Sequence, residues 1–247
     1  MTNLNPEVRI FADLETLSAA AAVLFIESSA RAIMERGRFL TAFSGGSTPL
    51  KLYKLLAQSP YREQVDWPRV HIFWGDERCV PPEDLENNYR QAHDVLLGYA
   101  PIPTGNIHRV QSDLEPETAA LNYALVLKQF ASAPLDWPRF DLVLLGMGND
   151  GHTASLFPGS EVDASTATLA VTAQYQGRPA NRVTLTPRVF NAARQIVFLV
   201  SGESKSEMLA NVLYGEYRPE QLPAQRIRPT DGELTWMVDQ NAAGKLW

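Results

Sequence analysis

The chain has 247 residues, of which 45% are hydrophobic, a formal net charge of -6 and a sequence pI near 5.3. This length allows one substantial core, and the acidic balance gives no overall attraction to nucleic acid or to an anionic membrane. An anionic ligand would therefore need a local cluster of donors. A single cysteine, Cys79, excludes an intrachain disulfide, and we find no targeting or anchoring segment, so we expect a cytoplasmic protein.

Hydrophobic patterning alternates along the chain between helical stretches and short apolar runs of strand length. The predicted strands lie at 39–43, 70–74, 140–145, 183–185, 196–200 and 234–237. The predicted helices lie at 14–35, 48–57, 88–97, 116–130, 187–193 and 205–213. The alternation predicts an α/β fold with an open, mainly parallel sheet flanked by helices, Rossmann-like in its layering. Because no linker or repeat divides the chain, we expect residues 1–247 to form a single domain.

Polar residues directly follow three of the predicted strands, in segments 44–49 (SGGSTP), 75–78 (GDER) and 146–152 (GMGNDGH). In open α/β sheets, ligands bind beyond the carboxyl ends of the strands. These three segments are therefore the first places to search for a functional site.

Segment 44–49 leads from a strand into a helix, with Pro49 in the first helical turn. We expect Ser47 or Thr48 to cap this helix. Two consecutive glycines let the backbone approach an anion closely, and the free N–H groups at the helix start favour a phosphate. The alternative is an ordinary strand-to-helix turn. No Gly-Lys-Ser/Thr follows, which excludes a Walker A loop.

A second feature favours an anion site. Residues 164–202 include no Asp or Glu but contain Arg178, Arg182, Arg188 and Arg194. Arg182 begins a predicted strand. Lys205 lies in the first turn of a predicted helix, where a cation is mildly disfavoured unless an anion binds nearby. The alternative is a solvated basic surface.

Segment 146–152 formally matches the G-x-G-x-x-G pattern of dinucleotide-binding turns. The acid expected about 20 residues further on is missing, so we reject a dinucleotide site. What remains is a glycine-lined turn that presents Asp150 and His152. A neutral imidazole can take a proton from water, and a carboxylate can orient the imidazole or a substrate hydroxyl. The structural alternative is a turn capped by Asp150 beside a half-buried His152.

Other chemistries have less support. The histidines occur singly, at His71, His93, His108 and His152, which makes a metal site less attractive. No G-x-S-x-G elbow is present, and nothing supports Cys79 as a nucleophile. We expect at least one carboxylate of Asp76 and Glu77 to face the site, although a solvated loop is the usual context for three adjacent charges such as Asp76-Glu77-Arg78.

Taken together, the motifs resemble the 6-phosphogluconolactonase family. The resemblance runs from about residue 39 to the C-terminus and rests on segments 44–49, 74–81, 87–89, 145–160, 181–186, 202–205 and 235–236. That family is similar in fold to glucosamine-6-phosphate deaminase, which shares an SGGSTP-like loop and a D-G-H turn. Deaminases typically have a catalytic acid where this chain has Phe157, and this difference favours lactone hydrolysis.

The resemblance implies a role for each site residue. His152 is implied as the general base, and Asp150 and Asp76 as residues that orient the base, the water or the sugar hydroxyls. The implied phosphate site comprises Ser44, Gly45, Gly46, Ser47, Arg182 and Lys205, and Arg78 contributes to substrate binding.

The implied reaction is hydrolysis of 6-phospho-D-glucono-1,5-lactone to 6-phosphogluconate in the oxidative pentose phosphate pathway. The expectation includes no cofactor or metal, a phosphorylated sugar lactone as the small-molecule partner, neither nucleic acid nor membrane, and a monomer or small homo-oligomer. The alternatives are a deaminase/isomerase and a non-catalytic sugar-phosphate sensor.

Overall fold

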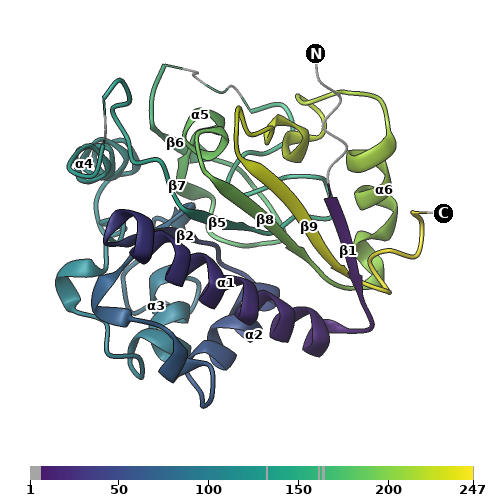
Figure 1. The fold of residues 1–247 in the computed structure, drawn as a ribbon. Helices are drawn as coiled ribbons and strands as arrows, with labels where there is room; N and C mark the ends of the chain where they lie inside the picture. The colour runs from purple at the N-terminus through teal and green to yellow at the C-terminus, as the bar shows by residue number, and fades with distance from the viewer. Residues whose placement is uncertain (1–6, 132, 161, 163–164, 247) are drawn as a thin grey trace.

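Six strands pair in parallel to form the large sheet of the protein (Figure 1). The computed structural model describes residues 7–131, 133–160, 162 and 165–246. In sheet order the strands are β1 (Glu7–Phe11), β9 (Glu233–Asp239), β8 (Gln195–Val200), β5 (Leu142–Leu145), β2 (Phe39–Phe43) and β3 (Val70–Trp74). Every neighbouring pair in this sheet runs parallel. The predicted α/β fold with a mainly parallel sheet is thus confirmed.

Helices cover both faces of the sheet, so its central strands β8, β5 and β2 are buried along their whole length. The helices are α1 (Leu14–Arg36), α2 (Ser47–Leu56), α3 (Asn88–Ala92), α4 (Pro116–Lys128), α5 (Pro187–Asn191) and α6 (Ser206–Tyr214). Along β5, Leu142 and Leu144 pack into a core with α1 and α2, while Val143 and Leu145 pack into a second core with α4, α5 and α6. Alternate residues therefore bury opposite faces.

Helix α1 is long and apolar enough to cross a membrane by length and composition alone, but half of that stretch is buried inside the fold. Its buried side chains include Leu17, Phe25 and Ala32, which belong to the core shared with α2. Asp13 caps its first turn by accepting the Thr16 N–H at 2.7 Å. The composition of α1 fits a core helix of the sheet.

A small antiparallel sheet, in the order β4–β7–β6, lies beside the large one. Its strands are β4 (Asp76–Arg78), β7 (Asn181–Leu185) and β6 (Thr168–Thr172). The chain leaves β3, passes Gly75 and pairs as β4 with β7. The N–H of Gly75 donates to Phe43 O and its carbonyl accepts the Leu185 N–H, both at 2.8 Å, so this one residue joins both sheets.

The predicted elements are all present, with exact bounds for β2 and β3 and shifted ends for the others, whereas β1, β4 and β6 were not predicted. Strands β1 and β6 are mostly exposed or half-buried, and β4 consists only of charged residues, so no buried apolar run marks these strands. The predicted helix 88–97 is wrong in part, because α3 ends at Ala92 and a π-helical turn, His93–Leu97, follows it.

We expect Phe198→Ala to lower the free energy of unfolding by about 3–5 kcal/mol, because it removes a fully buried ring from the middle of β8. The Phe198 ring stacks on Trp236 with centroids 3.8 Å apart. Denaturant unfolding measures the loss. Leu121→Ala, at a residue 69% exposed on α4, is the control and should change stability by less than about 0.5 kcal/mol. Equal effects from both substitutions would contradict this account of the core.

Candidate active site

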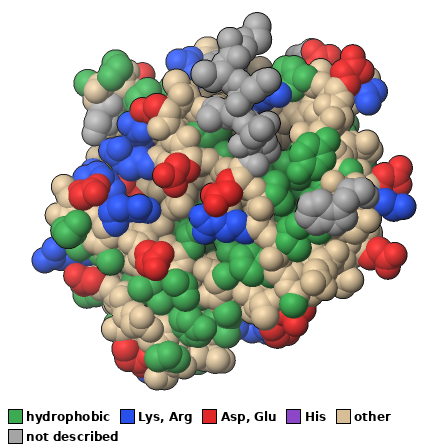
Figure 2. Space-filling view, turned by 45° about the vertical axis from the view of Figure 1, so that its right-hand side comes forward, with side chains coloured by type: hydrophobic (Ala, Val, Ile, Leu, Met, Phe, Trp, Pro, Cys, Tyr) green, Lys and Arg blue, Asp and Glu red, His purple; other side chains and the backbone are tan. Residues whose placement is uncertain are grey.

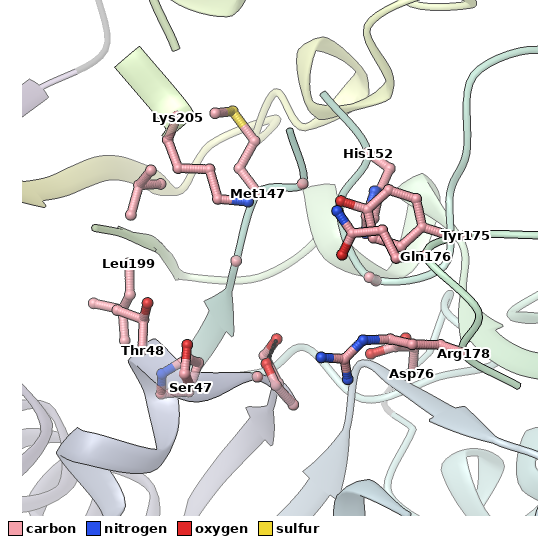
Figure 3. Close-up of a pocket in the computed structure, with 18 of the residues that line it drawn as sticks. Ser47, Thr48, Asp76, Met147, His152, Tyr175, Gln176, Arg178, Leu199 and Lys205 are labelled. Carbon is pink, nitrogen blue, oxygen red and sulfur yellow. Dashed lines mark hydrogen bonds between the residues drawn. The ribbon is translucent and has the colours of Figure 1, made fainter. Parts of the chain in front are cut away.

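A pocket of about 290 Å³ opens at the carboxyl ends of β2, β3, β5 and β8 (Figure 3). The structure brings nearly all predicted site residues into its lining: Ser44, Gly45, Gly46, Ser47, Asp76, Arg78, His152, Arg182 and Lys205. Asp150 does not line the pocket but contacts His152 from behind. The three segments chosen from the sequence therefore converge, as expected for loops at one edge of a parallel sheet.

Asp150 holds His152 in one orientation. Its Oδ1 lies 2.6 Å from His152 Nδ1 and also accepts the His152 backbone N–H at 3.2 Å. Burial pushes the pKa of Asp150 up, but the hydrogen bond and charge of His152 outweigh burial, so the pKa lies below its usual value. With Nδ1 engaged, Nε2 is the ring nitrogen left for chemistry. Asp150 thus both supports the turn and orients the imidazole.

Aromatic rings fix the His152 imidazole on its other sides. The Phe157 ring lies 4.5 Å away between centroids, and the Tyr175 ring lies 4.5 Å away in an edge-on arrangement. Figure 3 shows Tyr175 next to His152 at the wall of the pocket. Phe157, at the position of the deaminase acid, therefore packs against the imidazole and supplies no carboxylate.

Position 148 requires glycine, because its backbone lies directly against the His–Asp pair. A Cβ on this residue would lie 2.1 Å from His152 Nδ1 and 2.6 Å from Asp150 Oδ1, closer than atoms can pack. The Gly148 N–H also donates to the His152 carbonyl at 2.8 Å, which closes the turn. Of the glycines in this segment, Gly148 therefore makes room for the His–Asp pair.

The Asp-Glu-Arg segment is buried, so the solvated-loop alternative is wrong. Strand β4 alternates its side chains, and Asp76 and Arg78 line the pocket while Glu77 does not. Asp76 Oδ2 accepts a hydrogen bond from Ser155 Oγ at 2.6 Å, and the Arg78 guanidinium donates to Glu86 O at 2.7 Å. The Ser155 contact links β4 to the histidine loop.

Glu77 points away from the pocket and organises the backbone behind it. Its carboxylate accepts N–H groups of Arg78, Asn88 and Tyr89 at 2.7–2.8 Å. Burial raises the pKa of Glu77 to about 7, against the opposing effect of those N–H groups. Glu77 thus ties the start of α3 to β4, a role that the sequence alone did not indicate.

The predicted cap of α2 is wrong, because the helix begins at Ser47 and Gly46 occupies the N-cap position. Gly46 has φ +101°, which a residue with a side chain rarely adopts, and no side chain caps the helix. Within the described residues, the backbone N–H groups of Gly45, Gly46 and Ser47 donate to no acceptor. They are available to an anion in the pocket.

Two cations in the pocket, Arg182 and Lys205, make no ion pair within the described residues. Arg182 is 2% exposed, its Nε donates to Pro179 O at 3.1 Å, and its Nη2 has no hydrogen-bond partner within the described residues. The Lys205 ammonium makes no ion pair with the part of the chain described here, and Figure 3 shows it reaching into the pocket. Burial lowers the pKa of both groups, partly opposed by Asp76 at Arg182 and by Asp150 at Lys205. A bound anion would give both Arg182 and Lys205 a charged partner.

The other two arginines of the acid-free region lie outside the pocket. The Arg188 guanidinium stacks 5.1 Å from the centroid of Trp137, and Arg194 pairs with Asp141 at 3.3 Å. The acid-free stretch was therefore an incomplete guide, since only Arg178 and Arg182 of its four arginines line the pocket.

The turn between β6 and β7 adds residues that sequence reasoning did not assign to the site. Tyr175, Gln176 and Arg178 line the pocket from this hairpin. Arg178 pairs with Glu86 at 2.9 Å. The Gln176-Gly177 dipeptide was the available sign of a hairpin turn, but the flanking strand β6 was not predicted.

The remaining histidines and the cysteine lie apart from the pocket lining. His71 Nδ1 and His108 Nε2 lie 3.2 Å apart next to Phe130, and His93 is half exposed after α3. Burial raises the pKa of Cys79 to about 11, which keeps its thiol protonated. Of the four histidines, His152 is thus the one that lines the pocket and can act on a bound ligand.

These features define an α/β protein whose pocket contains a hydrogen-bonded His152–Asp150 pair beside the uncapped start of α2 and the cations Arg182 and Lys205. The chain belongs to the family of glucosamine-6-phosphate isomerases and 6-phosphogluconolactonase, whose model matches residues 12–236.

The similar proteins include 6-phosphogluconolactonases and a glucosamine-6-phosphate deaminase. A 6-phosphogluconolactonase of Synechocystis is 39% identical, over 98% of each chain. The solved 6-phosphogluconolactonase of Trypanosoma brucei is 30% identical with a TM-score of 0.84, over 98% of this chain and 99% of that one. A monomeric glucosamine-6-phosphate deaminase, 20% identical over 97% of this chain and 99% of that one, shares the fold with a TM-score of 0.83.

We expect Gly148→Ala to break the His152–Asp150 hydrogen bond, because the added methyl group occupies the space of both side chains. The NMR shifts of the His152 ring report the change. Gly146→Ala is the matched control, since its Cβ would meet nothing closer than Ser44 Oγ at 4.0 Å. A Gly148 variant with an unchanged His152 spectrum would show that the turn has room for a side chain.

Proposed function

We propose that the protein hydrolyses 6-phospho-D-glucono-1,5-lactone to 6-phosphogluconate in the oxidative pentose phosphate pathway, as a carboxylic ester hydrolase. The observation that carries the proposal is the oriented His152–Asp150 pair in a pocket that also holds two cations, Arg182 and Lys205, without an ion pair among the described residues. The 6-phosphogluconolactonases similar to this chain over nearly its full length support the substrate.

In the proposed mechanism, His152 is the general base. Asp150 accepts a hydrogen bond from Nδ1–H, which leaves Nε2 to take a proton from water as the water attacks the lactone carbonyl carbon. Backbone donors of the glycine-rich loop stabilise the oxyanion. The bond to the ring oxygen then breaks, and that oxygen takes the proton from His152 to become a hydroxyl. Atoms and charge balance without a covalent intermediate.

The substrate phosphate binds at the start of α2. The uncapped N–H groups of Gly45 to Ser47 point their dipoles at it, and Arg182 and Lys205 supply charge. On the face seen in Figure 2, basic and acidic side chains are intermixed, so phosphate attraction is a property of the pocket. Ser44 supports the cradle, since Tyr53 Oη bonds to both its N–H and its carbonyl.

Asp76 binds and orients a sugar hydroxyl in this scheme. Ser155 occupies its Oδ2, while its Oδ1 has only a 3.5 Å contact with Asn88 and is available to the ligand. Arg78, held by Glu86, adds positive charge at the same wall. Asp76 makes no hydrogen bond to His152 among the described residues, so we assign orientation of the base to Asp150.

The proposal extends to the cellular context. The proposed mechanism uses only side chains and backbone groups of this chain and water, so it requires no cofactor. A single half-buried cysteine with a raised pKa suits a reducing cytoplasm. We propose that the protein works there as a monomer or small homo-oligomer, with neither nucleic acid nor membrane as a partner.

We expect His152→Ala to lower turnover of freshly generated 6-phosphogluconolactone by about 10²–10⁴-fold, because general-base catalysis is lost. The rate is measured above the spontaneous background, with and without chelator. The control is His93→Ala, at a half-exposed residue outside the pocket lining, which should retain full turnover.

Unchanged turnover in His152→Ala would remove this residue from the mechanism. Wild-type rates no higher than background would overturn the lactonase proposal. Ammonia release from glucosamine 6-phosphate would then test the deaminase alternative, and phosphate-ester binding without turnover would indicate a sensor.

We expect Arg182→Ala and Lys205→Ala each to reduce kcat/KM for the phosphorylated lactone by about 10- to 100-fold, since each removes a charged hydrogen bond to phosphate. Weak activity on unphosphorylated gluconolactone should be unaffected. Lys128→Ala, on the exposed surface of α4, is the control for loss of charge. Equal losses on both substrates would argue against phosphate anchoring by Arg182 and Lys205.

A further inference from the structure

The hairpin between β6 and β7 ends in a two-residue turn at Gln176-Gly177. Tyr175 and Arg178 flank it as a bridge, with the Arg178 N–H donating to Tyr175 O at 3.0 Å. Both turn residues have positive φ, +51° and +68°. Turns of this kind match the twist of the strands and favour Asn-Gly, because asparagine tolerates the left-handed region. Glutamine is therefore an unfavourable choice for the turn itself.

The strain at Gln176 coincides with the pocket. Among the described residues, Gln176 and Ala154 are the non-glycine residues with positive φ, and both line this one pocket. Strained backbone concentrates at functional sites. Gln176 has a longer side chain than this turn prefers, and it lines a pocket. This combination indicates that the side chain contacts the ligand.

The neighbours of Gln176 hold the turn over the pocket. The Tyr175 ring packs on His152, and Arg178 pairs with Glu86 at 2.9 Å. Figure 3 shows Gln176 close to His152 and Tyr175, across the pocket from Ser47, Thr48 and Lys205. Gln176 itself makes no side-chain hydrogen bond within the described residues, so its carboxamide has a free donor and a free acceptor.

We propose that Gln176 determines substrate specificity by binding the hydroxyl on the carbon next to the lactone carbonyl. The inference rests on the proposed function: phosphate at the start of α2 places the carbonyl end of the sugar near His152. Gln176 lies at that end. A carboxamide that both donates and accepts matches a hydroxyl, and its unpaired groups disfavour a sugar that lacks one.

Two substitutions separate the turn from the contact. Gln176→Asn installs the residue that the turn prefers while withdrawing the amide by one methylene, and Gln176→Gly removes the side chain without backbone strain. We expect both variants to melt at the wild-type temperature or above. Their kcat/KM for 6-phosphogluconolactone should fall about 3- to 10-fold, the effect of losing one hydrogen bond.

The decisive comparison uses the 2-deoxy analogue of the lactone. Wild-type protein should prefer the parent lactone by about 3- to 10-fold, and both variants should process parent and analogue equally. Calorimetric binding of 6-phosphogluconate and its 2-deoxy form gives the same comparison without turnover, so it tests Gln176 even if the lactonase proposal fails. A preference for the 2-hydroxyl that survives in both variants would overturn the proposal, as would unchanged kcat/KM.

Discussion

Parallel pairing of the large sheet is the constraint on which the site depends. It forces the chain to leave β8, β5, β2 and β3, which are neighbours in that order, at one common edge. Four loops from distant parts of the sequence meet there. The central loop, after β5, carries His152, while the loops on either side carry the uncapped start of α2 and Lys205.

The sequence predicted those parts of the molecule that local rules govern. Segments such as 44–49 and 146–152 follow clearly apolar strands, so their polar residues were assigned to the site edge correctly. The hairpin residues Tyr175 and Gln176 were missed because β6 is short and partly exposed and acquires its partner only through the fold.

Two other features depend on tertiary contacts that no local pattern encodes. Strand β1 exists through pairing with β9, more than two hundred residues away in the chain. In the sequence, nothing distinguishes Glu77 from its charged neighbours Asp76 and Arg78. In the structure, the alternation of side chains along β4 directs Glu77 away from the pocket. At α2, the preference of Ser and Thr for helix caps gave the wrong residue, since the backbone conformation there requires Gly46.

The local charge of the pocket is opposite in sign to the net charge of the chain. The chain is acidic, yet Arg182 and Lys205 are kept partly desolvated in one pocket without full pairing. Such groups destabilise the empty protein and favour any state in which an anion neutralises them. The Ser155–Asp76 hydrogen bond further couples two loops 79 residues apart, so the histidine loop and β4 are held as one unit.

Gly75 hydrogen-bonds to both sheets, although the two sheets have no strand in common. The parallel sheet carries the acid–base pair and the start of α2, whereas the hairpin tip belongs to the small antiparallel sheet. At that tip, the Tyr175 ring packs on His152, whereas Gln176 makes no side-chain hydrogen bond to the parallel sheet among the described residues. On the proposed role of Gln176, a substitution at this one position lets a lineage change which sugar it binds while the His152–Asp150 pair stays the same, so substrate range and chemistry can diverge at independent rates.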